Sequence, residues 1–135
     1  MDVLVNLDVD DLEKAVRFYS AAFDLKVGRR FGTSAVELLG MTTPFYLLVQ
    51  KTGTAATAAG HPRTYERHWT PVHLDFVVDD IDAAVERALA AGAKVEKPAA
   101  IHSYGKLAVL ADPFGHGFCF IQFLGRGYDE IADRK

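Results

Sequence analysis

The residues best placed to do chemistry are His73 and Asp75, which lie two positions apart in the segment HLDFV. In an extended strand, residues two apart project from the same face, so the imidazole and the carboxylate are expected to be neighbours. An imidazole titrates near neutrality and can exchange a proton or a hydrogen bond there. The pair therefore indicates a ligand contact or acid–base chemistry, and a histidine satisfied by a neighbouring strand remains the alternative.

Five further side chains are candidates for contact with a ligand. Cys119 is the only cysteine and lies in an aromatic run, which favours a buried, inert thiol over a nucleophile that would need an activating base. Tyr46 offers a ring and a hydroxyl, which suit a pocket lining or the core equally. Asn6 is expected on the polar face of a strand. Trp69 and Tyr104 lie near the starts of strands and suit stacking on a flat ligand, although ordinary packing explains each one alone.

The elements that must position these residues fall into two sets. In the first set, Val5, Leu7 and Val9 alternate with polar residues, which predicts a strand. An apolar stripe from Leu12 to Phe23 predicts a helix, with Asp10 as its N-cap in a capping box. Further strands are expected at 26–31, 35–39 and 45–50.

The second set follows the same order. A strand is expected at 73–78, then a helix that begins after Asp79 as N-cap and carries an apolar stripe from Ile81 to Leu89. Gly92 stands where a helix C-terminus needs a residue that adopts positive φ. Strands are expected at 94–97, 107–110 and 118–123.

The two sets are an internal repeat. A shift of 69 positions lays Val9–Asp11 on Val78–Asp80 and puts Ala15 and Val16 on Ala84 and Val85. We predict an α+β fold of two tandem βαβββ units, with mixed, largely antiparallel sheets and the helices outside. The units are expected at 1–52 and 71–125, with a connector at 53–70 and a C-terminal tail at 126–135.

The alternation within strands assigns their faces. Leu74 and Phe76 are expected to pack under the helix, so His73 and Asp75 turn to the other face, as Asn6 does in the first unit. Two such sheets side by side enclose a cup with a few polar groups on apolar walls, which is the usual form of a small-molecule site. We expect Tyr46 and Cys119 to join this lining.

Composition argues against several kinds of partner. The 15 Lys and Arg against 18 Asp and Glu give a net charge of −3, and no basic cluster favours nucleic acid or an anionic membrane. No apolar run approaches the ~18 residues of a membrane span, and the acidic N-terminus does not resemble a signal peptide. A single cysteine forms no internal disulfide and fits a cytoplasmic protein. The expected partner is a small molecule.

The paired βαβββ units, the strand–VDD–helix step at Val78–Asp80 and the DPFGHGF turn resemble the vicinal oxygen chelate superfamily. That superfamily includes glyoxalase I, the extradiol dioxygenases and the bleomycin-resistance proteins. The resemblance implies a homodimer, and in catalytic members a divalent metal held by His and Glu from four strands. The matching positions in this chain are Leu4, Tyr46, His73 and Cys119.

One imidazole and one thiol fall short of the three protein ligands that a catalytic metal needs, so no cofactor is expected. The resemblance then implies a metal-free binding protein of the bleomycin-resistance kind that holds an aromatic or cationic ligand. The alternative is a glyoxalase-like lyase or a dioxygenase-like enzyme. It would use a displaced metal site, for which Glu37 is a candidate, or His73 and Asp75 as acid–base groups. A non-catalytic partner subunit is a third hypothesis.

Overall fold

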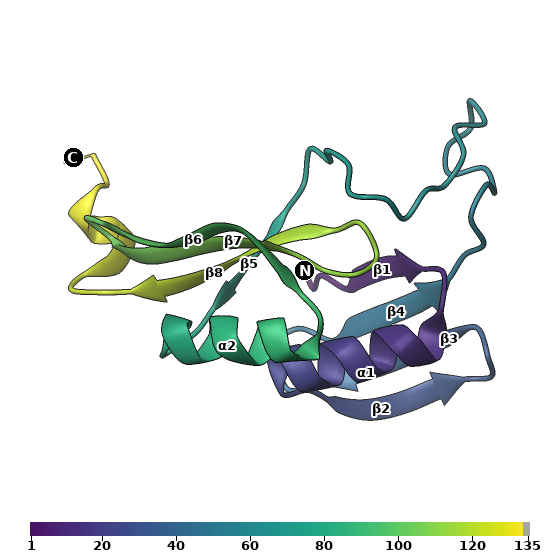
Figure 1. The fold of residues 1–135 in the computed structure, drawn as a ribbon, viewed down its shortest axis with the longest axis horizontal. Coiled ribbons are helices and arrows are strands. Elements are labelled where there is room, and N and C mark those ends of the chain that lie inside the picture. The colour runs from purple at the N-terminus through teal and green to yellow at the C-terminus, as the bar shows by residue number, and fades with distance from the viewer. Residues whose placement is uncertain (134–135) are drawn as a thin grey trace. The chain divides into compact units, whose positions relative to one another are not determined.

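The structure is a computed structural model that describes residues 1–133, so the last two residues of the expected tail lie outside it. The chain divides into two compact units, the first from Met1 to Glu66 and the second from Arg67 onward. Both units have the order strand, helix, strand, strand, strand (Figure 1). The predicted α+β fold with two βαβββ units is therefore confirmed.

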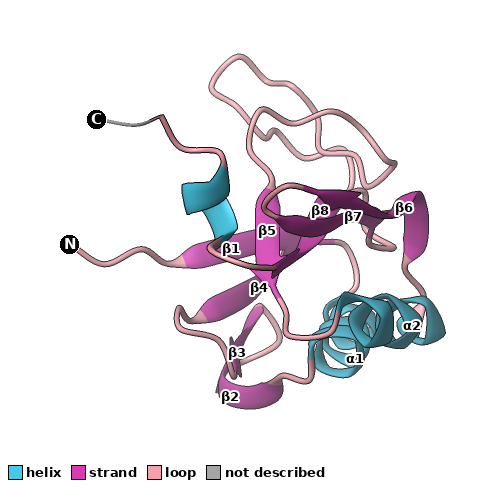
Figure 2. Cartoon of the chain, turned by 90° about the vertical axis from the view of Figure 1, so that its left-hand side faces the viewer, coloured by secondary structure: helices cyan, strands magenta, loops and turns pink. Residues whose placement is uncertain are grey.

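The first unit contains one four-stranded sheet and one helix (Figure 2). Its elements are β1 (Val5–Val9), α1 (Leu12–Phe23), β2 (Lys26–Phe31), β3 (Ala35–Leu39) and β4 (Phe45–Val49). The strand order is β1-β4-β3-β2. β1 runs parallel to β4, whereas the β4–β3 and β3–β2 pairs are antiparallel.

The second unit repeats this topology. Its elements are β5 (Leu74–Val77), α2 (Ile81–Ala91), β6 (Lys94–His102), β7 (Gly105–Ala111) and β8 (Gly117–Phe123). The order is β5-β8-β7-β6, with β5 parallel to β8 and the other pairs antiparallel. Both sheets are thus mixed and largely antiparallel, as predicted.

Each helix covers one face of its own sheet. The buried stripe of α1 consists of Leu12, Ala15, Val16, Phe18, Tyr19 and Ala22. It meets strand side chains that are at most 1% exposed, namely Val36, Leu38, Phe45 and Leu47. Burying an aliphatic or aromatic side chain of this size contributes about 1.5–3 kcal/mol. Within residues 1–133, no helix is long and apolar enough to cross a membrane.

The helix N-caps lie one residue later than predicted. The Asp11 carboxylate accepts a hydrogen bond from the Lys14 backbone N–H at 3.1 Å. Asp80 does the same for the Ala83 N–H at 3.1 Å. The assignment of Asp10 and Asp79 as caps was wrong, because two consecutive aspartates satisfy the same sequence pattern. The helices begin directly after the second aspartate of each pair, whose backbone is extended. Gly92 ends α2 with φ of 117°, as predicted.

Strand bounds in the second unit differ from the prediction by one or two residues in β5, β7 and β8, and the larger differences concern β6 and the tail. β6 continues to His102, where the sequence predicted an end at Lys97. Because β6 is an edge strand, it tolerates Pro98. Its register with β7 shifts between Val95 and Lys97 and again between Lys97 and Ala100, the interval that contains Pro98. The expected tail begins with a 3-10 helix at Gly127–Glu130, where the Tyr128 ring packs 4.8 Å from that of Phe123.

Candidate functional site

The second unit brings His73, Asp75 and Cys119 together on the sheet face opposite α2. Asp75 in β5 pairs with Cys119 in β8, and His73 immediately precedes β5. His73 Nδ1 lies 3.1 Å from Asp75 Oδ1, and the ligand atoms of all three residues lie within 4.8 Å of one another. The His73 side chain is 64% exposed and that of Asp75 34%, whereas Cys119 is buried. An imidazole and a carboxylate are therefore presented to solvent above a buried thiol.

The surroundings of Cys119 keep its thiol protonated. Burial, reinforced by the charge and hydrogen bond of Asp75, raises the pKa of Cys119 to about 11. Only a thiolate is an effective nucleophile, so this residue is a weak hydrogen-bond donor near neutral pH. The expectation of an inert thiol agrees with this environment.

The chemistry of these three donors fits one kind of metal ion. A thiolate, an imidazole and a carboxylate form a three-ligand set that leaves a further position open, which is typical of a catalytic zinc site. Ions that prefer oxygen, such as Mn²⁺, favour sets richer in carboxylates. The set therefore fits a zinc-type ion, provided that the ion displaces the thiol proton of Cys119.

The corresponding face of the first unit carries Asn6 and Tyr46. Asn6 in β1 pairs with Tyr46 in β4, just as Asp75 pairs with Cys119. Asn6 is the repeat partner of Asp75, so Tyr46 and Cys119 occupy equivalent places in the two sheets. Asn6 is exposed and Tyr46 is half-buried.

Two residues next to Tyr46 complete a cluster that the sequence did not predict. Glu37 is 5% exposed, and its carboxylate accepts hydrogen bonds from the Arg29 backbone N–H at 3.0 Å and from Arg29 Nη2 at 2.6 Å. The Tyr46 hydroxyl donates to the same carboxylate at 3.0 Å. These contacts, above all those from Arg29, lower the pKa of Glu37 to about 2, and they raise the pKa of Arg29. Since Arg29 and Tyr46 engage this carboxylate, Glu37 is a poor candidate for a displaced metal ligand.

A sequence signal for this cluster does exist. Glu37 is the one charged residue in the apolar strand AVELL, and a carboxylate buried in such a strand requires a cation close by. The identity of that cation was not evident, because it depends on the pairing of β2 with β3.

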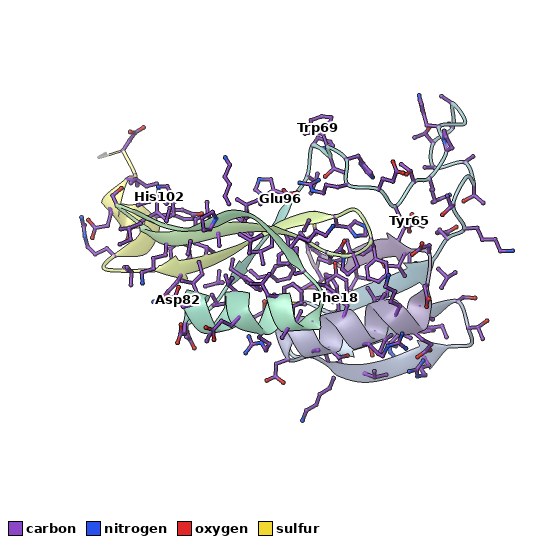
Figure 3. The ribbon with its side chains drawn as sticks, viewed as in Figure 1. Phe18, Tyr65, Trp69, Asp82, Glu96 and His102 are labelled. Carbon is purple, nitrogen blue, oxygen red and sulfur yellow. The ribbon has the colours of Figure 1, made fainter. Side chains whose placement is uncertain are left out.

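Trp69 and Tyr104 do not join either cluster of hydrogen-bonded side chains. Trp69 lies on the loop before β5 and is 81% exposed (Figure 3). Tyr104 occupies the β6–β7 turn, where its ring stacks on His102 at 5.2 Å. Gly105, the next residue, pairs with Phe123 at the end of β8, four residues beyond Cys119.

The connector is tied to both units by its arginines. In the first unit, Arg63 Nε lies 3.0 Å from Asp8 Oδ2, and the Tyr65 hydroxyl donates to the Gln50 carbonyl at 2.6 Å. In the second unit, Arg67 pairs with Glu96 at 2.8 Å. The Arg67 guanidinium also lies over Gly117, where a Cβ atom would collide with it. The segment that leads into His73 is thereby anchored to its own sheet.

Comparison with known proteins places this fold in a family. Residues 4–121 match the model of the glyoxalase-like domain. The uncharacterized protein Mb0911c of Mycobacterium bovis is 33% identical over 124 residues, which cover 82% of this chain and 76% of that protein. The anthracycline biosynthesis protein DnrV of Streptomyces peucetius is 30% identical over 128 residues. That match covers 95% of this chain but 43% of DnrV, so the chain spans less than half of that relative.

Solved structures agree on the fold. The fosfomycin resistance protein FosX of Listeria monocytogenes superimposes with a TM-score of 0.71 at 19% identity, over 96% of both chains. A variant of that protein has been solved in complex with Mn(II) and a dihydroxypropylphosphonic acid. The family match and the repeated βαβββ architecture together show that the chain belongs to the glyoxalase-like domain family of the vicinal oxygen chelate superfamily.

Proposed function

We propose that this protein binds a small molecule without a resident catalytic metal and that the ligand is aromatic or cationic. The observation that carries the proposal is the division of faces in the second unit. One face of its sheet is packed under α2, while the other presents the exposed His73 and Asp75 above the buried Cys119. Polar groups fixed on an otherwise apolar wall are typical of small-molecule sites.

The charges at this site favour a ligand that donates hydrogen bonds. The Asp75 carboxylate is an acceptor and a negative charge, so it suits a cation or an N–H or O–H donor. His73 holds one ring nitrogen toward Asp75, which leaves the other for the ligand. The exposed Trp69 precedes His73 by four residues on the anchored loop, and its indole suits stacking on a flat ring.

The printed names of relatives support a small molecule as the partner. DnrV is named for the biosynthesis of an anthracycline, which is an aromatic compound, and FosX for resistance to fosfomycin. These activities belong to those proteins. For this chain they favour the general class of a binding or modifying protein for small molecules.

A thermal-shift screen tests the proposal. The purified full chain is melted with planar aromatic amines, neutral aromatics and aliphatic amines, and saturating binders are expected to raise Tm by mass action. His73→Ala should reduce the shift and leave the Tm of the free protein nearly unchanged, because His73 is mostly exposed. His102→Ala is the matched control, since His102 lies at the far end of β6. Failure of every class to shift Tm would refute small-molecule binding of this kind.

The second candidate function is metal-assisted catalysis of the glyoxalase or dioxygenase type, and the cluster of three donors favours it. His73, Asp75 and Cys119 would hold the ion, which would act as a Lewis acid toward a bound oxygen. Metal analysis of protein purified without added metal decides between the two functions. Stoichiometric zinc that is lost in His73→Ala would contradict the metal-free proposal and support the metal site that the second function requires.

A further inference from the structure

The cluster of Arg29, Glu37 and Tyr46 in the first unit has the form of a recognition site. Glu37 lies beneath, and the Arg29 guanidinium lies outermost, with 68% of its side chain exposed. Arg29 uses Nε and Nη2 for the carboxylate, and Nη2 also donates to the Tyr46 hydroxyl at 3.2 Å. Within residues 1–133, Nη1 makes no hydrogen bond. The ion pair therefore presents its positive end and free N–H donors to solvent.

The fold itself does not require this cluster. Tyr46 and Cys119 are equivalent in the repeat, and their partners across the sheet are Glu37 and Val109. The second sheet thus forms with an apolar residue where the first places a buried carboxylate. An ion pair with one largely exposed partner contributes little net stability, because solvent screens the charge of the exposed group. Stability alone is therefore a weak explanation for the Arg29–Glu37 pair.

The backbone is shaped to hold the guanidinium in place. The register between β2 and β3 shifts between Val27 and Arg30, which marks a bulge. A Cβ atom on Gly28 would lie 2.6 Å from Glu37 Oε1, so glycine there lets the carboxylate reach the Arg29 N–H. The guanidinium also lies over the Phe31 ring, 5.7 Å from its centroid. Arg29 is thus fixed by a carboxylate, a hydroxyl and an aromatic ring.

We infer that Arg29 is a specificity-determining residue that binds a carboxylate or similar planar oxyanion carried by an aromatic ligand. The Nη1 donors match a carboxylate oxygen, and a charge-assisted hydrogen bond of this kind is strong and directional. Glu37 partly offsets the charge of Arg29, so charge attraction alone contributes little binding free energy for a small aliphatic anion. A flat ring adds stacking on the guanidinium plane and on Phe31, which is 45% exposed.

This inference goes beyond the proposed function, because it assigns a ligand of opposite charge to a separate cluster. The Arg29 cluster also differs in location from the proposed small-molecule site. Its residues belong to the first unit, whereas His73 and Asp75 belong to the second. The two can therefore be tested separately on the same protein.

The experiment uses nuclear magnetic resonance on the full chain with three probes: naphthoate, naphthylmethylamine and acetate. Naphthoate is expected to shift the Arg29 side-chain N–H and the Gly28 amide saturably, and acetate is expected to shift neither. Arg29→Lys keeps the charge but loses the planar fork, and it should weaken naphthoate binding by about tenfold. Arg30→Lys is the matched control, because Arg30 pairs with Glu13 and takes no part in the cluster.

The outcomes separate the two claims. If naphthoate leaves the Arg29 and Gly28 signals of the wild-type protein unchanged, the inference is wrong, whether or not Arg29→Lys folds. If naphthylmethylamine nevertheless shifts the resonances of His73 or Trp69, the proposed function stands although the inference about Arg29 fails. Equal naphthoate affinity of wild type and folded Arg29→Lys also overturns the inference.

Discussion

At the scale of single residues, the environment of Cys119 decides what its thiol can do. The side chain lies in β8 beside Asp75, and both burial and that carboxylate disfavour the thiolate. A cysteine activated for nucleophilic attack has the opposite surroundings, with cations or a helix N-terminus nearby. The structure therefore favours hydrogen bonding over covalent chemistry at this position.

Asp75→Asn should make Cys119 more reactive. Removing the negative charge lowers the pKa of the thiol from about 11, although burial, the largest cause, keeps it above its ordinary value. The rate of reaction with a thiol reagent should rise with pH in both proteins and be higher in the variant at about pH 8. Asp129→Asn, in the 3-10 helix, serves as the control. Equal rates for wild type and Asp75→Asn would contradict the role given to the carboxylate.

Glu37→Gln should lower stability in a pH-dependent way. Arg29 holds the folded-state pKa of Glu37 at about 2, below its ordinary value, so its stabilising contribution is present above about pH 4.5. That contribution is lost as the pH falls toward 2. The gap in unfolding midpoint between wild type and variant should therefore be widest near neutral pH and close on acidification.

Urea denaturation at several pH values measures this gap. Glu13→Gln is the control, because the Glu13–Arg30 pair is exposed on both sides and such pairs contribute little. A gap that stays constant between pH 7 and 2 would show that the charge of Glu37 is not responsible.

At the scale of elements, each helix begins at the second of two consecutive aspartates. The side chains of Asp11 and Asp80 each satisfy a backbone N–H that the first turn leaves without a partner. The first aspartates, Asp10 and Asp79, lie outside the helices and form no such cap. Four nearly equivalent residues thus divide into two that cap and two that do not.

Replacing an aspartate with alanine should lower stability appreciably only at the second aspartate of each pair. Asp11→Ala and Asp80→Ala are each expected to reduce the free energy of unfolding by about 1 kcal/mol. Asp10→Ala and Asp79→Ala should each change it by less than about 0.5 kcal/mol. Chemical denaturation of the four variants tests this assignment of the caps. A larger loss of unfolding free energy at the first aspartate of either pair would show that the assignment is wrong.

At the scale of the whole molecule, each of the two sheets ends in two edge strands. The outer strands are β1 and β2 in the first unit and β5 and β6 in the second. Edge strands carry backbone groups available for pairing, and proteins commonly cover them by assembly. Closed two-fold dimers are the commonest soluble assemblies.

We therefore predict a homodimer. Light scattering should give twice the 14.8 kDa of one chain at micromolar concentration. A charge-reversing change on an edge strand, such as Lys97→Glu in β6, should weaken the dimer if that edge takes part, with the exposed Glu86 on α2 reversed to Lys as the control. A mass equal to one chain across the accessible concentration range would refute the prediction.

The sequence by itself determined the repeated element order and the faces of the strands. Periods of 2 and 3.6 are local properties, so Val5, Leu7 and Val9 reveal the apolar face of their strand without knowledge of its neighbours. The proximity of His73 and Asp75 follows from the same local rule.

The tertiary structure decided what depends on strand pairing. Only the parallel β5–β8 register brings Cys119 beside Asp75, and only the bulge between β2 and β3 turns Arg29 toward Glu37. Register depends on long-range packing. At the β2–β3 bulge it also depends on Gly28, where a Cβ atom would collide with the Glu37 carboxylate. A one-residue slip in either pairing would turn the paired residues to opposite faces and break up the cluster built on that pairing, so neither complete cluster follows from a local pattern alone.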